Sequence, residues 1–180
     1  MSKLSSFVFV AATMSSSMSW AAQPLKLDQD KSKIEFVGKK TDGQHAGGFK
    51  KFEVDATADF ENPENGTLLI TIEASSLWSD DDKLTDHLKN PDFFDVRKHP
   101  KIVFKASSIK ADEEEATLTG KMTMLGKEVE ITAPCKVEVS DEALTVHAEF
   151  KIDRTKWGMN YGAGKIENEV PITAHLVFKR

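Results

Sequence analysis

The chain of 180 residues contains one cysteine, so it cannot form an intrachain disulfide, and its fold is expected to depend on its apolar core. It also lacks any run of 18 or more apolar residues after the N-terminus, which argues against a membrane-spanning helix. The sequence contains 24 Lys and Arg and 29 Asp and Glu, for a formal net charge of -5. Nucleic acid is therefore not an expected partner, because phosphate binding requires concentrated positive charge.

Motifs of common catalytic and metal sites are also absent. The sequence has no Gly-x-Ser-x-Gly motif and no glycine-rich phosphate loop. Its five histidines lack the close pair spacing of a typical zinc site, and Cys135 has no histidine near it in sequence. We therefore predict neither an enzyme nor a bound metal or cofactor, and we expect Cys135 to be a buried small hydrophobe. A hydrolase or a three-histidine site assembled from distant strands stays open as an alternative.

The N-terminus has the pattern of a cleavable secretory signal. Lys3 is followed by an apolar segment over residues 4–14, and residues 19–21 (Ser-Trp-Ala) place small residues at the positions that a signal peptidase recognises. We expect residues 1–22 to be removed on export. Residues 23–180 contain no linker, repeat or low-complexity segment, so a single domain is expected.

Alternation of apolar and polar residues dominates the rest of the sequence. Between Phe52 and Phe60, apolar side chains occupy every second position, and Glu, Asp or Thr occupy the others. Successive side chains of a strand point to opposite faces, so this pattern predicts half-buried β-strands. The pattern recurs at residues 34–36, 68–74, 102–106, 116–124, 129–133, 144–152 and 170–178.

Short turns connect these segments, as at residues 125–127 (Leu-Gly-Lys), and short turns between sequential strands imply antiparallel pairing. We predict an all-β fold with eight to nine antiparallel strands. Sheets of this size usually close and thereby remove their edge strands, so a barrel is favoured. A sandwich of two sheets is the alternative.

The alternation is interrupted once, before the strand that begins near residue 101. Ser79 and Asp80 are candidate N-cap residues, and Leu84 and Leu88 lie four residues apart, on one face of a helix. We predict a short helical insertion around residues 79–95 that covers the barrel or its mouth.

The inward-facing stripes contain many small residues, which predicts unfilled volume inside the barrel. Native interiors tolerate few voids, and an eight-stranded barrel can hold one small ligand, so an internal apolar ligand is expected. The small residues are Ala56, Ala58, Ala74, Ala106, Gly120, Ala133, Ala148 and Ala174.

Residues outside the alternation are expected at the ends of the barrel. The glycine-rich stretch at residues 157–164 is too irregular for a strand, and we expect a loop at the barrel mouth, with a lid as the more specific alternative. Several aromatic residues either close the barrel ends or line the mouth of the cavity: Phe49, Trp78, Phe93, Phe94 and Trp157.

Four blocks of sequence, in their order and spacing, resemble the YceI-like family. Each block alone is weak, but together they cover residues 27–179. The blocks are residues 45–52 (HAGGFKKF), 86–104 (with DHLKNPDFFD and HPKIVF), 118–126 (LTGKMTMLG) and 150–158 (FKIDRTKWG).

The resemblance implies a lipocalin-like antiparallel barrel whose pore binds a polyisoprenoid lipid, and exported bacterial members act in the periplasm. Accordingly we expect a periplasmic protein that sequesters or carries such a lipid and uses no cofactor besides it. We predict that His45, Asp86 and His87 lie near the lipid head group. Seven further residues are predicted along the mouth or the tail: Phe49, Phe52, Leu84, Leu88, Phe93, Phe94 and Trp157.

One position departs from the family pattern, which commonly places an arginine before the Asp-His-Leu motif, where this chain has Thr85. If that arginine contacts an anionic head group, this chain favours an uncharged one, such as an isoprenoid quinone, unless Lys83 or Lys89 compensates. Stable membrane insertion is not expected, and a homodimer is compatible with the sequence. The alternatives are a fatty acid or fatty amide in the same pore, or a ligand-free barrel that binds a partner protein.

Overall fold

The computed structural model describes residues 22–112 and 114–179, so residues 1–21 of the predicted signal segment lie outside the described residues. The predicted all-β class is confirmed. No helix in these two ranges is long and apolar enough to cross a membrane. The elements are β1 (Gln23–Leu27), β2 (Lys33–Lys40), β3 (Gly43–Phe49), β4 (Phe52–Ala58), η1 (Pro63–Asn65), β5 (Thr67–Glu73), η2 (Ala74–Ser76), β6 (Leu77–Ser79), α1 (Asp82–Leu88), β7 (Lys101–Asp112), β8 (Glu115–Met124), β9 (Lys127–Val139), β10 (Ala143–Asp153), η3 (Arg154–Trp157) and β11 (Glu169–Lys179).

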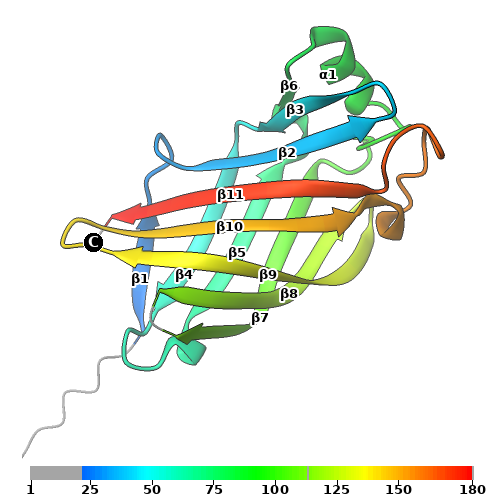
Figure 1. The fold of residues 1–180 in the computed structure, drawn as a ribbon. Coiled ribbons are helices and arrows are strands. Elements are labelled where there is room, and N and C mark those ends of the chain that lie inside the picture. The colour runs from blue at the N-terminus through cyan, green and yellow to red at the C-terminus, as the bar shows by residue number, and fades with distance from the viewer. Residues whose placement is uncertain (1–21, 113, 180) are drawn as a thin grey trace, which may run out of the picture.

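Eight strands close into an antiparallel barrel (Figure 1). Their order is β1-β4-β5-β7-β8-β9-β10-β11, and β1 returns to β11, where Leu27 pairs with Phe178. Between β8 and β9, Leu125 and Gly126 have φ values of 52° and 72°, as a two-residue type I′ hairpin requires. The predicted barrel is therefore confirmed over the sandwich, and closure pairs β1 with β11, the first and last of these eight strands.

Three strands, β2, β3 and β6, extend the sheet beyond the barrel. β11 pairs with β2 over residues 172–175 and with β1 at its end, so two strands share one side of it. β3 pairs with β2, and β6 pairs with β3. Glycines allow close packing here, because a Cβ on Gly47 would lie 2.6 Å from the Phe36 ring, and one on Gly48 would lie 2.7 Å from the carbonyl oxygen of Ile34.

The Gly47→Ala substitution is expected to lower the free energy of unfolding by about 1–3 kcal/mol, as overpacking does. The added methyl group would meet the Phe36 ring and also the backbone carbonyl oxygen of Trp78, 2.8 Å away. Gly38→Ala is the matched control, because the atom nearest its Cβ would be 4.0 Å away. Urea unfolding measures both variants, and equal stability of the two would contradict tight packing at Gly47.

The predicted helical insertion is present as α1, with turns after it. Its N-cap is Asp81, whose carboxylate accepts a hydrogen bond of 2.8 Å from the backbone N–H of Leu84. The prediction that Ser79 or Asp80 caps the helix is wrong. Both side chains are bound elsewhere: Ser79 contacts the hydroxyl of Thr85, and Asp80 accepts hydrogen bonds from β3.

Side chains fill one end of the barrel, where β11 ends and β10 begins. Phe178 and Leu176 are only 2% and 3% exposed, and Leu144 packs with them in the main core. Cys135 is buried as predicted, and burial raises the pKa of its thiol to about 11. The opposite end, where β10 ends and β11 begins, is not filled in this way.

Candidate functional site

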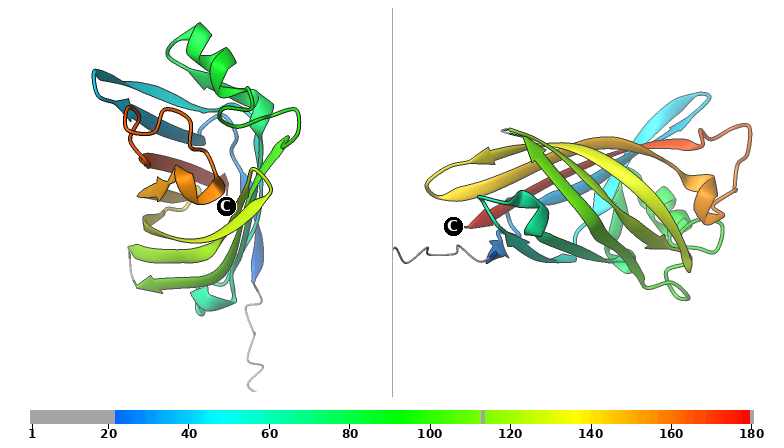
Figure 2. Two further views of the ribbon diagram at one scale, coloured as in Figure 1. Left: turned by 90° about the vertical axis from the view of Figure 1, so that its right-hand side faces the viewer. Right: turned by 90° about the horizontal axis from the view of Figure 1, so that it is seen from below.

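The hollow end of the barrel contains a cavity of about 180 Å³. Met124 of β8, Ile152 of β10 and Ile172 of β11 form part of its wall, together with Phe36 of β2. Figure 2 shows α1 and the segment between η3 and β11 at this same end, which we call the mouth. The wall is apolar almost throughout, so the cavity suits hydrocarbon rather than a polar molecule.

The cavity does not lie where the small residues of the sequence predict it. None of the eight alanine and glycine positions in the inward stripes lines it. Ala116, Cys135 and Ala148 instead form a separate buried cluster, and a Cβ on Gly120 would lie 2.4 Å from the carbonyl oxygen of Lys105. An apolar cavity is present, but its predicted cause is wrong, because the small residues do not line it and several of them are packed against their neighbours.

Three phenylalanine rings meet in the cavity wall. The ring centroids of Phe36 and Phe49 are 5.9 Å apart, and Phe94 lies 6.3 Å from the first and 5.7 Å from the second. The rings come from β2, β3 and the turns after α1. They pack at tilted or edge-to-face angles and make no hydrogen bonds, so they can reorient without leaving a polar group unpaired.

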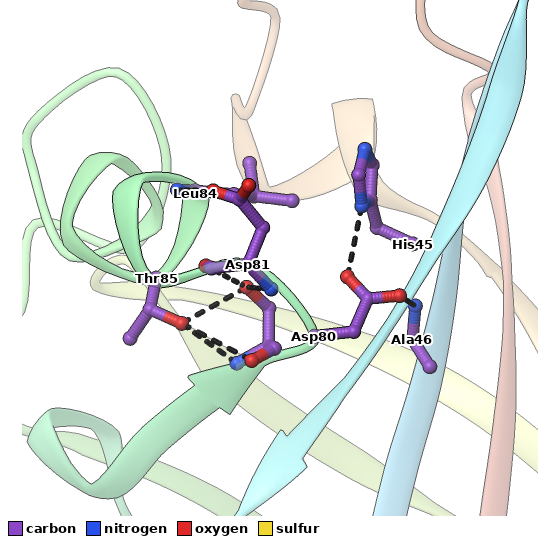
Figure 3. A network of polar contacts seen from close by, with 7 residues as sticks. His45, Ala46, Asp80, Asp81, Leu84 and Thr85 are labelled. Atoms are coloured by element: carbon purple, nitrogen blue, oxygen red, sulfur yellow. Dashed lines mark hydrogen bonds and ion pairs between the residues drawn. The ribbon is translucent and has the colours of Figure 1, made fainter.

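A histidine–aspartate pair lies at the rim of the cavity. The His45 side chain is 36% exposed and lines the cavity, and its Nδ1 lies 2.8 Å from Oδ1 of Asp80 (Figure 3). Oδ2 of Asp80 accepts a hydrogen bond of 3.0 Å from the Ala46 N–H. The hydrogen bonds from Ala46 and then His45 hold the pKa of Asp80 below its usual value. Among the described residues, Nε2 of His45 has no hydrogen-bond partner.

Hydrogen bonds between Ser79 and Thr85 attach α1 to β6 beside this pair (Figure 3). The Ser79 N–H donates to Oγ1 of Thr85 at 2.8 Å, and the two hydroxyl oxygens are 2.9 Å apart. The helix thereby places Leu84 and Leu88 in the cavity wall. Thr85 stands at the position where the resembling family commonly has an arginine. Its hydroxyl makes hydrogen bonds to Ser79 within the protein.

The segment between η3 and β11, which we call the closing loop (residues 158–168), covers the mouth from the other side. Met159 and Ile166 line the cavity. At the tip of the loop, Tyr161 is 45% exposed, and its ring centroid lies 5.0 Å from that of His87 in α1. The prediction of a loop at the barrel mouth is confirmed.

Six of the ten predicted ligand-contacting residues line the cavity. They are His45, Phe49, Leu84, Leu88, Phe93 and Phe94. Phe52 and Trp157 lie in the core at 6% and 1% exposure, and the Trp157 Nε1–H donates to the carbonyl oxygen of Met122. Asp86 is exposed on α1, and His87 lies at the mouth outside the cavity wall. Ligand contact stays a prediction for all ten residues.

Several residues of the site were missed from the sequence. Asp80 was considered only as a helix cap, because its partner His45 is 35 residues away and approaches it only through the pairing of β3 with β6. One feature of the sequence could have indicated Met159 and Ile166: both are apolar residues in or beside a glycine-rich stretch. Arg154, which also lines the cavity, lies in the family block at residues 150–158, but no pattern marked it as a site residue.

The described part of the chain has no group of three or more His, Cys, Asp or Glu side chains that could hold a metal ion. The closest histidines are His147 and His175, which face each other across β10 and β11 with ring centroids 5.9 Å apart. Nε2 of His147 lies 3.1 Å from a carboxylate oxygen of Glu149, so this pair is a surface cluster of the barrel wall.

Low pH is expected to lower the stability of the folded protein by protonating Asp80 at the rim of the cavity. The folded-state pKa of Asp80 is lowered, so its contribution to stability is present above the ordinary aspartate pKa of about 3.9 and is lost as the pH falls through the lower folded value. Between pH 5 and pH 3, the wild type should therefore lose more stability than Asp80→Asn does. Urea unfolding across this range is the measurement. Identical slopes for the two proteins would show that Asp80 has an ordinary pKa in the folded protein.

Comparison with known sequences gives a family match over most of the chain. The family described as YceI-like domain matches residues 25–178. Protein YceI of Escherichia coli O6:H1 is 31% identical over 91 residues, which are 51% of this chain and 48% of that protein. A UPF0312 protein of Pseudomonas putida (strain GB-1) is 35% identical over 81 residues, which are 44% of this chain and 42% of that protein. The aligned segment thus spans less than half the length of these two relatives.

Solved structures share the barrel. BcnA of Burkholderia cenocepacia has a TM-score of 0.79 at 29% identity, and the match covers 84% of this chain and 99% of BcnA. A polyisoprenoid binding domain from Saccharophagus degradans has a TM-score of 0.67 at 13% identity, with coverage of 86% and 97%, a likeness that concerns the fold alone. The lipocalin-like barrel expected from the sequence blocks is confirmed, and the chain belongs to the YceI-like family.

Proposed function

We propose that this protein binds a polyisoprenoid lipid, with its tail in the cavity at the hollow end, and sequesters or carries it in the periplasm. The observation that supports this most is the apolar wall of the cavity inside a closed barrel. The polyisoprenoid binding domain of Saccharophagus degradans, which shares the fold, supports the choice of lipid class.

The cavity volume bears on how such a lipid is held. At about 180 Å³, the cavity is close to the engineered voids of about 150 Å³ that bind benzene, and below the 300–1,000 Å³ of typical ligand pockets. In the present conformation it therefore holds one short segment of a chain. A longer tail requires more space, which the Phe36, Phe49 and Phe94 rings or the closing loop would provide by moving.

Burial of the tail supplies the driving force. At about 25 cal/mol per Å², removing on the order of 500 Å² of tail from water contributes roughly 12 kcal/mol, of which ordering costs take half or more. This force has no direction, so any preference among lipids with the same tail must come from polar groups at the rim.

His45 is the rim residue best placed to contact a head group. Asp80 orients the ring through Nδ1 and leaves Nε2 without a partner in the described part of the chain. Nε2 is a hydrogen-bond acceptor in the tautomer that donates through Nδ1, and a donor when the ring is protonated. An uncharged head with a hydroxyl group can donate to Nε2 of the neutral ring, whereas a quinone carbonyl can only accept from Nε2 of the protonated ring. For an anionic head, Lys39 and Lys40 are available in the cavity wall, whereas Lys83 and Lys89 of the α1 region lie outside that wall.

Mass spectrometry of organic extracts tests the lipid class directly. The protein is purified without detergent from a bacterial periplasm, and we expect a stoichiometric polyisoprenoid whose mass gives the chain length and head group. A bound fatty acid or fatty amide would support the role as a lipid carrier but would contradict the choice of a polyisoprenoid as the ligand. The proposal would be contradicted if the folded protein yields no lipid and also does not bind added quinone or prenyl lipid. That result would favour a protein-interaction module.

The role of His45 is tested by His45→Phe, which keeps an aromatic ring at the rim. Losing one hydrogen bond of about 1 kcal/mol should weaken binding of an isoprenoid alcohol, whose hydroxyl can donate to Nε2, about five- to tenfold. Binding of a polyisoprenoid hydrocarbon without a head group should not change. Titration of delipidated protein with both lipids, followed by tryptophan fluorescence, measures this. Equal losses for the two lipids would mean that His45 shapes the wall instead of binding a head group.

A further inference from the structure

Arg154 is a buried charged residue that the proposed function does not yet explain. It follows the last residue of β10, begins η3, is 3% exposed and lines the cavity. Its guanidinium donates three hydrogen bonds to backbone carbonyl oxygens: Nη1 to Met159 at 2.8 Å, Nε to Glu167 at 3.0 Å and Nη2 to Ile166 at 3.3 Å.

The charge of Arg154 has no carboxylate in contact with it among the described residues. The neighbouring Asp153 carboxylate is occupied by the backbone N–H and the hydroxyl of Thr155, at 3.0 and 2.6 Å. Burial lowers the pKa of Arg154, and the charge of Asp153 opposes that shift. Placing a charged group here is costly when an apolar residue of similar size could fill the space. The barrel alone therefore gives no reason for an arginine at this position.

All three acceptors belong to the closing loop. Met159 lies at its beginning, and Ile166 and Glu167 lie near its end, so one side chain holds both ends of the loop against the barrel. Met159 and Ile166 are also the two loop residues in the cavity wall. Between them, Gly162 and Gly164 have positive φ values of 68° and 78°, a backbone conformation that glycine adopts without steric cost.

The far part of the loop has a different attachment. Tyr161 at the tip contacts the rings of His87 and Phe93, at centroid distances of 5.0 and 5.1 Å. These contacts lie at the surface, since Tyr161 is 45% exposed. The loop is thus held at its base by the charge-assisted hydrogen bonds of Arg154 and weakly at its tip by exposed ring contacts. Near β11 it is also held by backbone hydrogen bonds to the β2 side, from the Glu167 N–H to the Lys39 carbonyl oxygen at 2.9 Å and from the Thr41 N–H to the Lys165 carbonyl oxygen at 3.1 Å. Arg154 is therefore the side chain that joins the two ends of the loop.

We infer that Arg154 is a positioning residue that fixes the closing loop over the cavity and thereby slows the departure of a bound lipid tail. This inference rests on the proposed function for its lipid part and on geometry alone for the loop. A lysine at this position has one ammonium group and cannot match the fork of a guanidinium over three carbonyls. Arg154→Lys keeps the charge and should release the base of the loop.

Hydrogen exchange of the delipidated protein tests the loop without any ligand. In Arg154→Lys we expect the amides of residues 159–167 to exchange at least about tenfold faster relative to those of β8 and β9 than in the wild type. A general loss of stability would instead accelerate loop and barrel in equal proportion, and that result, or an unchanged loop, would overturn the inference. Lys151→Met, which removes an exposed cation on β10, is the matched control and should leave the ratio unchanged.

Lipid release provides the second measurement. For the lipid found in the wild type, Arg154→Lys should raise the dissociation rate constant at least about tenfold and change the association rate constant less. Tyr161→Ala, which loosens only the tip, should have a smaller effect. Faster loop exchange with an unchanged release rate would refute the role in lipid retention. If the wild type binds no lipid at all, the proposed function fails, while the exchange experiment still decides whether Arg154 positions the loop.

Discussion

Replacing Ile172 with tryptophan is expected to weaken binding of a polyisoprenoid tail at least about 50-fold while leaving the barrel folded. Ile172 lies on β11 between its paired residues Phe150 and Phe36, and its side chain lines the cavity. The larger indole would occupy much of a space of about 180 Å³ and prevent the tail from burying its surface there. Losing on the order of 100 Å² of burial corresponds to an affinity at least about 50-fold lower. Lipid titration of delipidated protein measures this change.

The matched control for Ile172→Trp is Thr173→Trp, on the next residue of the same strand. Its side chain points to the opposite face of the sheet, so it adds the same ring outside the barrel. Urea unfolding of both variants checks the fold, since overpacking costs about 1–3 kcal/mol when no space is available. Val170→Phe is a second, smaller filling change in the cavity wall. Wild-type affinity in both filled variants would show that the lipid binds elsewhere.

The barrel was predictable because alternation records which face of each strand is buried. In β4, for example, Phe52 and Ala56 are buried, whereas Glu53 and Asp55 are exposed. β3 was not predicted, since close packing against Phe36 and Trp78 requires glycine where the alternation would have an apolar side chain. Where packing requires glycine, the alternation of apolar and polar side chains is interrupted. A strand of this kind therefore cannot be predicted from alternation.

The site was predictable where residue spacing or a family block marks its residues, and this includes Phe93 and Phe94 in the turns after α1. Leu84 and Leu88 line the cavity as their spacing on one helical face suggested. The pair of His45 with Asp80 and the contacts of Arg154 depend on strand pairing and on the path of a loop, which single-sequence patterns do not contain. The position of the cavity depends on how side chains from several strands pack together, so the small residues of the inward stripes, which do not line it, did not indicate where it lies.

Phe178→Ala is expected to lower the free energy of unfolding by about 3–5 kcal/mol, the largest stability change that we predict. Phe178 is 2% exposed and pairs with Leu144 of β10 and Leu27 of β1, at the junction that closes the barrel. A loss of this size should lower Tm by about 6–20 °C for a chain of this length. Thermal and urea unfolding must use delipidated protein, because a bound ligand adds its own stabilisation. A change below about 1 kcal/mol would contradict tight packing at the filled end.

The same variant separates stability from binding. Phe178 does not line the cavity, so Phe178→Ala should bind the lipid with nearly wild-type affinity at temperatures where it is folded. Phe178→Leu, which retains more apolar volume, should lose less stability and bind equally well. If Phe178→Ala instead accepts longer tails than the wild type does, the filled end limits how far the tail enters. An unchanged preference for tail length would mean that the filled end stabilises the barrel and the hollow end alone provides the binding volume.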